Sequence, residues 1–282
     1  MPPGVLFLTA GADVGKDHIE VGVSAWGRAR RRWLVDHFRI EGNTQLPKVW
    51  EEAADAVHRV YRNAEGVEFS LLKFFIDTSA WPEIVKPWVR RQNQQIVMGC
   101  DGLDHLDQAV KVEVQAEPVR GMPNKKTRIG ALRIAQVGVS LLKAELVGVL
   151  SIPRPESSDE APPDWLHLPK QGFTKEMAKQ LVSERKVILR DANGRLTGTR
   201  WERIEGRRAE VLDCHNYAVG RRTGRMGPLQ GPGLRTLGEK DRRGRCRDQV
   251  LEGGGGPRRS CDRRARSEGR GRSPQACSLR SL

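Results

Sequence analysis

Three aspartates occupy positions from which they can act together on metal ions. Asp13 and Asp77 each follow a short apolar run, and Asp213 lies in an amphipathic segment close to residue 220. Carboxylates that are brought together repel one another, which raises their pKa unless cations neutralise them. Two Mg²⁺ or Mn²⁺ ions about 3.5–4 Å apart suit phosphodiester cleavage, because one activates the attacking water and the other stabilises the leaving oxygen. A single aspartate is as often a turn former or a helix cap, so the prediction depends on the three acting jointly.

The N-terminal elements that position Asp13 are predicted to form an antiparallel meander. The apolar run at 5–9 predicts a strand that ends in a turn at 10–13. Apolar and polar residues alternate at 19–25, and the run at 33–40 predicts a third strand. Consecutive strands with short connections pair antiparallel, so these three form a meander.

The rest of the body alternates between helical and extended patterns. Apolar residues three and four positions apart predict helices, and short apolar or alternating runs predict strands. In chain order the patterns predict a helix at 49–61, a strand at 71–76, a helix at 82–92, a strand at 96–98, a helix at 137–150, a loop at 151–164, a helix at 173–186, a hairpin at 187–200 and a helix at 208–219.

This order of elements is typical of the ribonuclease H-like fold. It is an α/β fold with a mixed sheet, in which an antiparallel three-strand meander is followed by parallel strands and helices flank the sheet. The first and fourth strands of such a sheet are neighbours, so we expect Asp13 and Asp77 to lie side by side. We assign Asp13 as the ligand that bridges both metal ions, with Asp77 completing one metal site and Asp213 the other, the roles that these positions have in the fold.

The positive charge of the chain is placed very unevenly. The 282 residues carry a formal net charge of +14, and residues 221–282 hold sixteen Arg and one Lys against six acids. That segment therefore supplies eleven of the fourteen charges, and the body before it is only mildly basic. Binding of nucleic acid by the body has to depend on local patches rather than on total charge.

Residues 221–282 form a low-complexity segment rich in Arg and Gly, for which two interpretations stay open. The first is a disordered basic tail that adds non-specific affinity for phosphates. The second is an out-of-frame translation of a GC-rich gene, because the composition changes abruptly inside a promising helix. We therefore expect a catalytic domain at 1–220 and a separate tail at 221–282.

The sequence also predicts the compartment and the state of the cysteines. It shows neither an apolar stretch of about 18 residues nor the pattern of a signal peptide, which predicts an intracellular protein that does not span a membrane. The five cysteines include no Cys-x-x-Cys pair, so we expect reduced thiols and no zinc site.

Seven stretches between residues 5 and 218 resemble the nuclease part of the GpA-type large terminase subunits of tailed bacteriophages. Each stretch is weak alone, but the set follows the order of the family. Where the family has Asp-Thr-Gly-Gly, this chain has Asp77-Thr78-Ser79-Ala80, which gives a less flexible turn. The stretches are VLFLTAGADV, VGVSAWGRARRRWLVDHFRIEGN, FFIDTSAW, VGVSLLKAEL, DWLHLP, QLVSER and RRAEVLDCHNYA.

The resemblance implies a function, a cofactor and partners. It implies a ribonuclease H-like endonuclease that cuts concatemeric double-stranded DNA during genome packaging with two Mg²⁺ or Mn²⁺ ions. It also implies a small terminase subunit and a portal protein as partners, in the cytoplasm of a bacterial host. The family carries an N-terminal ATPase domain with a glycine-rich phosphate loop, whereas no G-x-x-x-x-G-K-S/T motif occurs here. We therefore expect that this chain does not translocate DNA by itself.

Several cations are candidates for contact with DNA. Lys143 recurs in the helix motif of the family, where a lysine can act as a point charge on a phosphate. The other candidates lie in predicted exposed turns, where ordinary solubilising charge is the alternative. They are Arg28, Arg30, Arg31 and Arg32 at a hairpin tip, and Lys125 and Lys126 in a loop between residues 114 and 130.

Two rival functions remain at the level of the sequence. A resolvase or transposase-like nuclease of the same fold would share the acids but not the stretches DWLHLP and EVLDC. A non-catalytic, DNA-binding prophage remnant would bind DNA through its tail without cutting it. A plasmid-nicking assay separates the enzyme from the remnant.

Overall fold

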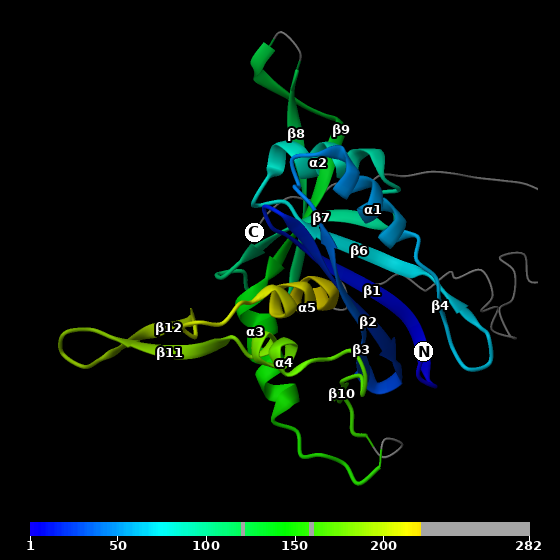
Figure 1. The fold of residues 1–282 in the computed structure, drawn as a ribbon. Coiled ribbons are helices and arrows are strands. Elements are labelled where there is room, and N and C mark those ends of the chain that lie inside the picture. The colour runs from blue at the N-terminus through cyan, green and yellow to red at the C-terminus, as the bar shows by residue number, and fades with distance from the viewer. Residues whose placement is uncertain (120–121, 158–160, 221–282) are drawn as a thin grey trace, which may run out of the picture. The chain divides into compact units, whose positions relative to one another are not determined.

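An eight-stranded mixed sheet forms the centre of the fold. The computed structural model describes residues 1–119, 122–157 and 161–220, so the predicted tail at 221–282 lies outside the described residues. The strands lie in the order β10-β3-β2-β1-β6-β7-β9-β8 (Figure 1). They are β1 (Val5–Val14), β2 (His18–Gly27), β3 (Arg32–Glu41), β6 (Leu71–Asp77), β7 (Val97–Leu103), β8 (Val110–Val119), β9 (Met122–Gly138) and β10 (Leu166–His167).

Strands β1, β2 and β3 form the predicted antiparallel meander. Strand β1 is longer than predicted, because it continues through Ala10, Gly11 and Ala12 and includes Asp13, which pairs with Glu20 of β2. The prediction of a turn at 10–13 was therefore wrong. These small residues are not a turn signal here, because they allow a helix to pack closely against the strand, as shown below.

The second half of the sheet is parallel. Strand β6 pairs parallel with β1 and with β7, and β7 pairs parallel with β9, whereas β8 returns antiparallel beside β9. The first strand is thus central, with the meander on one side and the parallel strands on the other. This topology confirms the predicted ribonuclease H-like fold. The hairpin of β8 and β9 was not predicted, and the segment expected to be a loop around Lys125 and Lys126 is part of strand β9.

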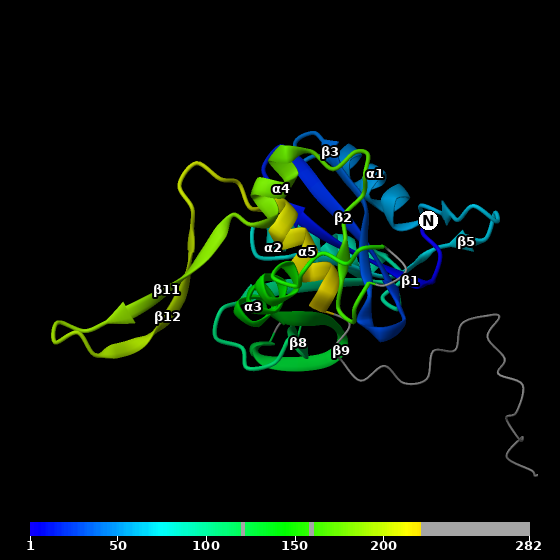
Figure 2. The ribbon, with the colours of Figure 1, turned by 90° about the horizontal axis from the view of Figure 1, so that it is seen from below.

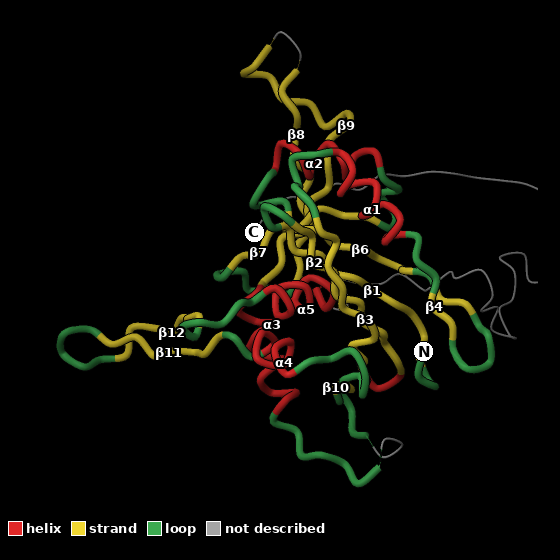
Figure 3. The backbone as a smooth tube through the Cα atoms, in the orientation of Figure 1, coloured by secondary structure: helices red, strands yellow, loops and turns green. Residues whose placement is uncertain are grey.

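Helices cover both faces of the sheet (Figures 2 and 3). On one face, α1 (Pro47–Val57) and α2 (Pro82–Arg91) bury apolar side chains against the sheet. Trp50 and Trp88 meet there, with ring centroids 5.4 Å apart, and the Trp88 indole donates to the Trp50 carbonyl. On the other face lie α3 (Val139–Leu150), α4 (Lys175–Leu181) and α5 (Glu210–Gly220). None of the described helices is long and apolar enough to cross a membrane.

Two predicted helices are shorter in the structure. Helix α1 ends at Val57, and the residues after it form β4 (Tyr61–Arg62), which pairs with β5 (Glu68–Phe69). Helix α4 ends at Leu181, and β11 (Glu184–Arg190) then pairs with β12 (Leu196–Arg203) in the predicted hairpin. In both places, residues whose apolar spacing predicted a helix pair as strands instead. A short 3₁₀ turn, η1 (Arg28–Arg30), connects β2 to β3.

Helix α5 packs directly on the backbone of β1 because Gly11 has no side chain. A Cβ atom at Gly11 would lie 2.1 Å from the Cys214 carbonyl oxygen and 2.7 Å from the Ala218 nitrogen. The Thr9 hydroxyl donates to the Ala218 carbonyl on the same face, two residues earlier on β1. Cys214 is a buried free thiol, as predicted. The close approach fixes the distance of the helix from the sheet.

We predict that Gly11→Ala destabilises the protein, because the added methyl group would overlap backbone atoms that cannot move without displacing α5. The expected loss in the free energy of unfolding is about 1–3 kcal/mol or more, measured by urea denaturation. Gly148→Ala is the matched control, since nothing lies within 4 Å of its added Cβ and alanine favours a helix by about 0.5–1 kcal/mol. Equal stability of the two variants would contradict the close packing of α5 on β1.

Candidate metal centre

Asp13 and Asp77 lie level with each other on adjacent strands. Ala12 pairs with Ile76 in the parallel ladder of β1 and β6, so the next residue of each strand is an aspartate. Neighbouring strands are about 4.8 Å apart, and level residues of a sheet point to the same face. Because side chains alternate along β1, Asp13 points to the same face as Gly11, where α5 lies. The two strands are neighbours, as predicted.

Asp213 joins them from the first turn of α5. Burial, together with the charges of Asp213 and Asp77, raises the pKa of Asp13 to about 7. Burial likewise raises the pKa of Asp213 to about 6, although the nearby Lys143 opposes this. The structure therefore brings together three acids that are 64 and 136 positions apart in the chain.

Asp77 is held in place by the turn that follows its strand. Its carboxylate accepts hydrogen bonds from the Ser79 backbone N–H, at 3.0 Å, and from the Ser79 hydroxyl. Burial raises the pKa of Asp77, and these hydrogen bonds counteract part of that rise. Asp101 of β7 raises it further and itself accepts a hydrogen bond from the Thr78 hydroxyl. Sequence reasoning missed Asp101, which stands on the strand beside Asp77.

The donor set fits a hard divalent cation. The three aspartates offer only carboxylate oxygens, which are the ligands that Mg²⁺ and Mn²⁺ prefer. Their raised pKa values show that each negative charge is unfavourable here without a compensating cation. Within the described ranges, no three His, Cys, Asp or Glu side chains form a ready-made ligand set. The three carboxylates therefore act on one another's pKa but do not by themselves form a complete set of metal ligands in this structure.

A buried ion pair stands next to Asp213. The Lys143 ammonium of α3 donates to the Glu184 carboxylate at 2.7 Å, and both side chains are about nine-tenths buried. Glu184 begins strand β11, directly after the end of α4. The expected contact of Lys143 with DNA is therefore replaced, in this structure, by a contact with an acid. Glu184 lies in the stretch QLVSER, but the prediction of a continuous helix at 173–186 concealed its place at the base of a hairpin.

A second charged network lies on the other side of Asp13. Glu20, opposite Asp13 on β2, is 2.8 Å from the His37 imidazole and accepts a hydrogen bond from Arg39 at 2.8 Å. Burial acts to raise the pKa of Glu20, but these two partners outweigh it and hold the pKa at about 2. Glu20 is therefore a fully ionised carboxylate beside Asp13. It adds to the negative potential at the site.

The candidate arginines of the turn between β2 and β3 lie at the opposite end of β1 from Asp13. Arg28 and Arg30 belong to η1, which follows Gly27, the partner of Val5 at the start of β1. Eight residues of strand separate that level from Asp13, or roughly 25 Å. Arg28, Arg30 and Arg31 therefore do not flank the aspartates.

Arg32 is not a surface residue at all, which corrects its assignment as a DNA contact. Its side chain is 1% exposed and donates to Glu145 at 2.6 Å. Its guanidinium also lies 5.6 Å from the centre of the Trp26 ring. Arg30 is paired with Asp164, so it is also engaged within the protein. Arg30 thus connects η1 to the loop before β10, and Arg32 connects the start of β3 to α3.

Lys125 and Lys126 are also distant from the aspartates. Asp77 is level with Cys100 of β7, and Cys100 is level with Ala135 of β9. Lys126 precedes Ala135 by nine residues on the same strand, which corresponds to roughly 30 Å. The hairpin of β8 and β9 extends away from the body in that direction (Figure 1).

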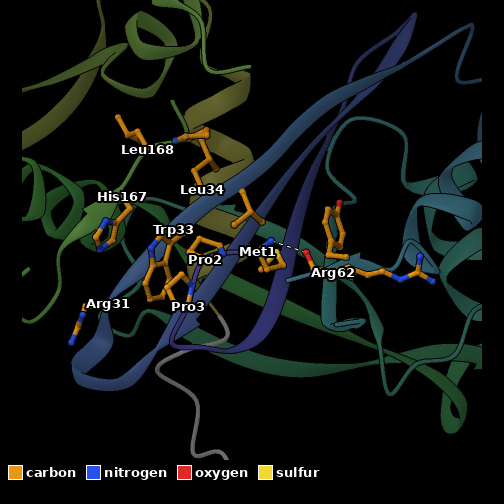
Figure 4. A pocket seen from close by; sticks show the side chains of 12 residues that line it. Met1, Pro2, Pro3, Arg31, Trp33, Leu34, Arg62, His167 and Leu168 are labelled. Carbon is orange, nitrogen blue, oxygen red and sulfur yellow. Dashed lines mark hydrogen bonds between the residues drawn. The ribbon is translucent and has the colours of Figure 1, made fainter. Parts of the chain in front are cut away.

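A pocket of about 430 Å³ lies apart from the aspartates (Figure 4). Trp33 and His167 stack in its wall with ring centroids 5.0 Å apart, and the Met1 ammonium donates to the Arg62 carbonyl. Trp33 is six residues from Arg39 on β3, which places it about 20 Å from the level of Asp13. None of the three aspartates lines this pocket, so the chemistry predicted for them does not involve it.

We predict that the carboxylate cluster makes stability depend on pH when no metal ion is added. An acid whose pKa rises on folding, as for Asp13 from 3.8 to about 7, binds more protons in the folded state. The free energy of unfolding therefore falls as pH rises between those values. In metal-free buffer at about pH 8, Asp13→Asn should be more stable than the unmodified chain by roughly 1–3 kcal/mol, and the difference should vanish near pH 4.

Urea denaturation at both pH values measures this difference. Asp55→Asn, which alters an exposed carboxylate on α1, is the control and should change little at either pH. A loss of stability in Asp13→Asn at the higher pH would show that the Asp13 carboxylate is not repelled by its neighbours.

The sequence is similar to that of phage terminases. The chain is 28% identical over 222 residues to the protein named "Terminase, large subunit" of Escherichia phage lambda, a match that covers 78% of this chain and 32% of the lambda protein. The chain thus spans about a third of the length of the curated relatives that it matches.

Two solved structures are also similar. The large terminase nuclease of thermophilic phage G20c matches 76% of this chain and 82% of its own, at 14% identity and a TM-score of 0.38. The nuclease domain of the large terminase of bacteriophage SPP1, solved with bound Mn, matches 77% of this chain and 88% of its own, at 12% identity and a TM-score of 0.37. These scores are too low to support an assignment on their own.

The family match covers nearly all of the described chain. The profile described as "Terminase large subunit gpA, endonuclease domain" matches residues 1–224, a range that includes Asp13, Asp77 and Asp213. The resolvase and transposase-like alternatives are thereby set aside. With the sheet topology and the convergent acids, this match shows that the chain belongs to the family of terminase large subunit gpA endonuclease domains.

Proposed function

We propose that residues 1–220 form a metal-dependent DNA endonuclease domain in which Asp13, Asp77 and Asp213 hold two divalent metal ions. The observation that carries this proposal is the convergence of three acids from β1, β6 and α5 on one face of the sheet. Bound Mg²⁺ or Mn²⁺ would supply a low-pKa water and would neutralise charge on the leaving oxygen. Asp13, from the central strand, would contact both ions, while Asp77 and Asp213 would each contact one.

The neighbouring residues prepare the carboxylates for this role. Ser79 fixes the orientation of Asp77 through two donors. Lys143 acts to lower the pKa of Asp213, against burial and the charge of Glu184, and so favours the ionised, metal-binding form of Asp213. We propose that Lys143 acts as this fixed counter-charge, and that the carboxylate of Glu184 positions it.

The substrate and partners follow from the family. We propose that the domain cuts concatemeric double-stranded DNA during packaging of a phage genome, in the cytoplasm of the bacterial host. The small terminase subunit and the portal protein are the proposed partners of the packaging complex. We do not propose translocation of DNA by residues 1–220, since the mechanism above involves only phosphodiester cleavage.

The test is nicking of a supercoiled plasmid in the presence of Mn²⁺. We predict that the unmodified chain nicks the plasmid and that EDTA abolishes the reaction. Asp13→Asn should reduce the rate by about a thousandfold or more, since loss of metal-borne charge stabilisation of about 4 kcal/mol corresponds to that factor. Asp55→Asn, on the surface of α1, should retain the full rate.

Circular dichroism and thermal melting must first show that each variant is folded. An intact plasmid at high concentrations of folded, unmodified protein would favour a non-catalytic DNA-binding remnant. Cleavage by folded Asp13→Asn at the unmodified rate would exclude the proposed metal centre.

A further inference from the structure

The hairpin of β11 and β12 projects from the body (Figures 1 and 2). Seven residues of β11 correspond to an arm about 24 Å long. At its base the two chain segments are joined by the hydrogen bond from the Ile204 N–H to the Ser183 carbonyl, at 2.8 Å, and by the bond from the Arg207 guanidinium to the Val182 carbonyl. The ion pair of Glu184 with Lys143 anchors the first residue of the arm.

The strand register divides the arm into two faces. Glu184 pairs with Arg203, Lys186 with Trp201 and Ile188 with Thr199, and paired residues point to the same side. We call this side the site face, because Glu184 at its base forms the buried ion pair with Lys143 of α3, and the charges of Glu184 and Arg203 both act on the pKa of Asp213. Because side chains alternate along a strand, Arg185, Val187, Arg200 and Glu202 lie on the opposite face.

The arm carries cations on both faces. On the opposite face, the Arg200 guanidinium donates to Glu202 at 2.8 Å, and Arg185 is exposed and lies opposite Glu202 in the strand register. On the site face, Lys186 is exposed and has no ion-pair partner among the described residues. The arm as a whole, residues 184–203, carries six cations against three acids.

The site face also combines charge with exposed apolar surface. Ile188 is 58% exposed, and the half-buried Trp201 lies beside Lys186. A two-stranded antiparallel ribbon has the width to enter the major groove of a duplex, which is about 12 Å across. Lysine and arginine at the edge of such a ribbon meet phosphates, which position the duplex without reading its sequence.

We infer that the site face of the β11–β12 arm binds a DNA duplex beside the bond to be cut, with Lys186 on a backbone phosphate. This inference rests on the proposed nuclease function and extends it by assigning the surface that orients the substrate. The site face begins with Glu184 and Arg203, which act on Asp213, and continues outward along the arm through Lys186 and Trp201. A duplex that lies along it would extend from the metal centre over the length of the arm.

The test compares two adjacent residues on opposite faces. Binding of a short fluorescent DNA duplex to the full chain is followed by anisotropy in EDTA, over a range of salt concentrations. Lys186→Ala should weaken binding by about threefold to tenfold and reduce the slope of log K against log salt by about 1. Arg185→Ala removes the same charge one residue away, from the face turned away from the site, and should leave both values unchanged. The cations beyond residue 220 contribute equally to both variants.

A third variant protects the test against a simple loss of folding. Lys186→Arg should restore affinity, because it keeps the phosphate contact. Equal effects of Lys186→Ala and Arg185→Ala would overturn the assignment of the arm, while metal-dependent nicking by the unmodified chain would leave the proposed function intact. If the folded, unmodified chain neither binds nor nicks DNA, the proposed function fails and this inference fails with it.

Discussion

The structure depends on the contact between α5 and the backbone of β1. Gly11 permits this contact, because any side chain there would occupy the place of the Cys214 carbonyl. Packing of the helix therefore places the Asp213 carboxylate beside Asp13, in a setting where burial and mutual repulsion raise the pKa of both acids. Favourable packing of apolar surface offsets the unfavourable electrostatics of the acids, which is common at functional sites.

Charged residues lie on two sides of the three aspartates. Glu20 is kept ionised by His37 and Arg39 on the meander side of Asp13, and Lys143 is held by Glu184 on the side of Asp213. Each of these partners comes from a different element, so the electrostatics of the site depend on the whole body being assembled. Among the described residues, Lys143 and Arg203 act to lower the pKa of Asp213, but burial and the neighbouring acids outweigh them.

Two groups of cations in the body differ in their position relative to the aspartates. Arg30 and Arg32 are bound to acids of their own chain, about 25 Å along the strands from Asp13. Cations of the β11–β12 arm, by contrast, start beside Asp213 and extend outward. A charge count cannot separate these groups, because it ignores whether a cation already has a partner and on which edge of the sheet it lies. In the proposed function, the cations of the arm lie closer than Arg30 and Arg32 to the substrate that the aspartates would hold.

The sequence by itself determined the order of the main elements, the meander and the neighbouring first and fourth strands, because periodicity and local motifs are properties of short segments. It also supplied the three acids that are proposed to bind metal ions. It did not determine the end of β1, the β8–β9 hairpin or the partners of Lys143 and Arg32. Small residues such as Ala10 and Gly11 read locally as a turn, and only a helix from the far end of the chain explains them. Ion pairs such as Lys143 with Glu184 join residues 41 positions apart, so they exist only after the chain has folded, and tertiary structure alone decided them.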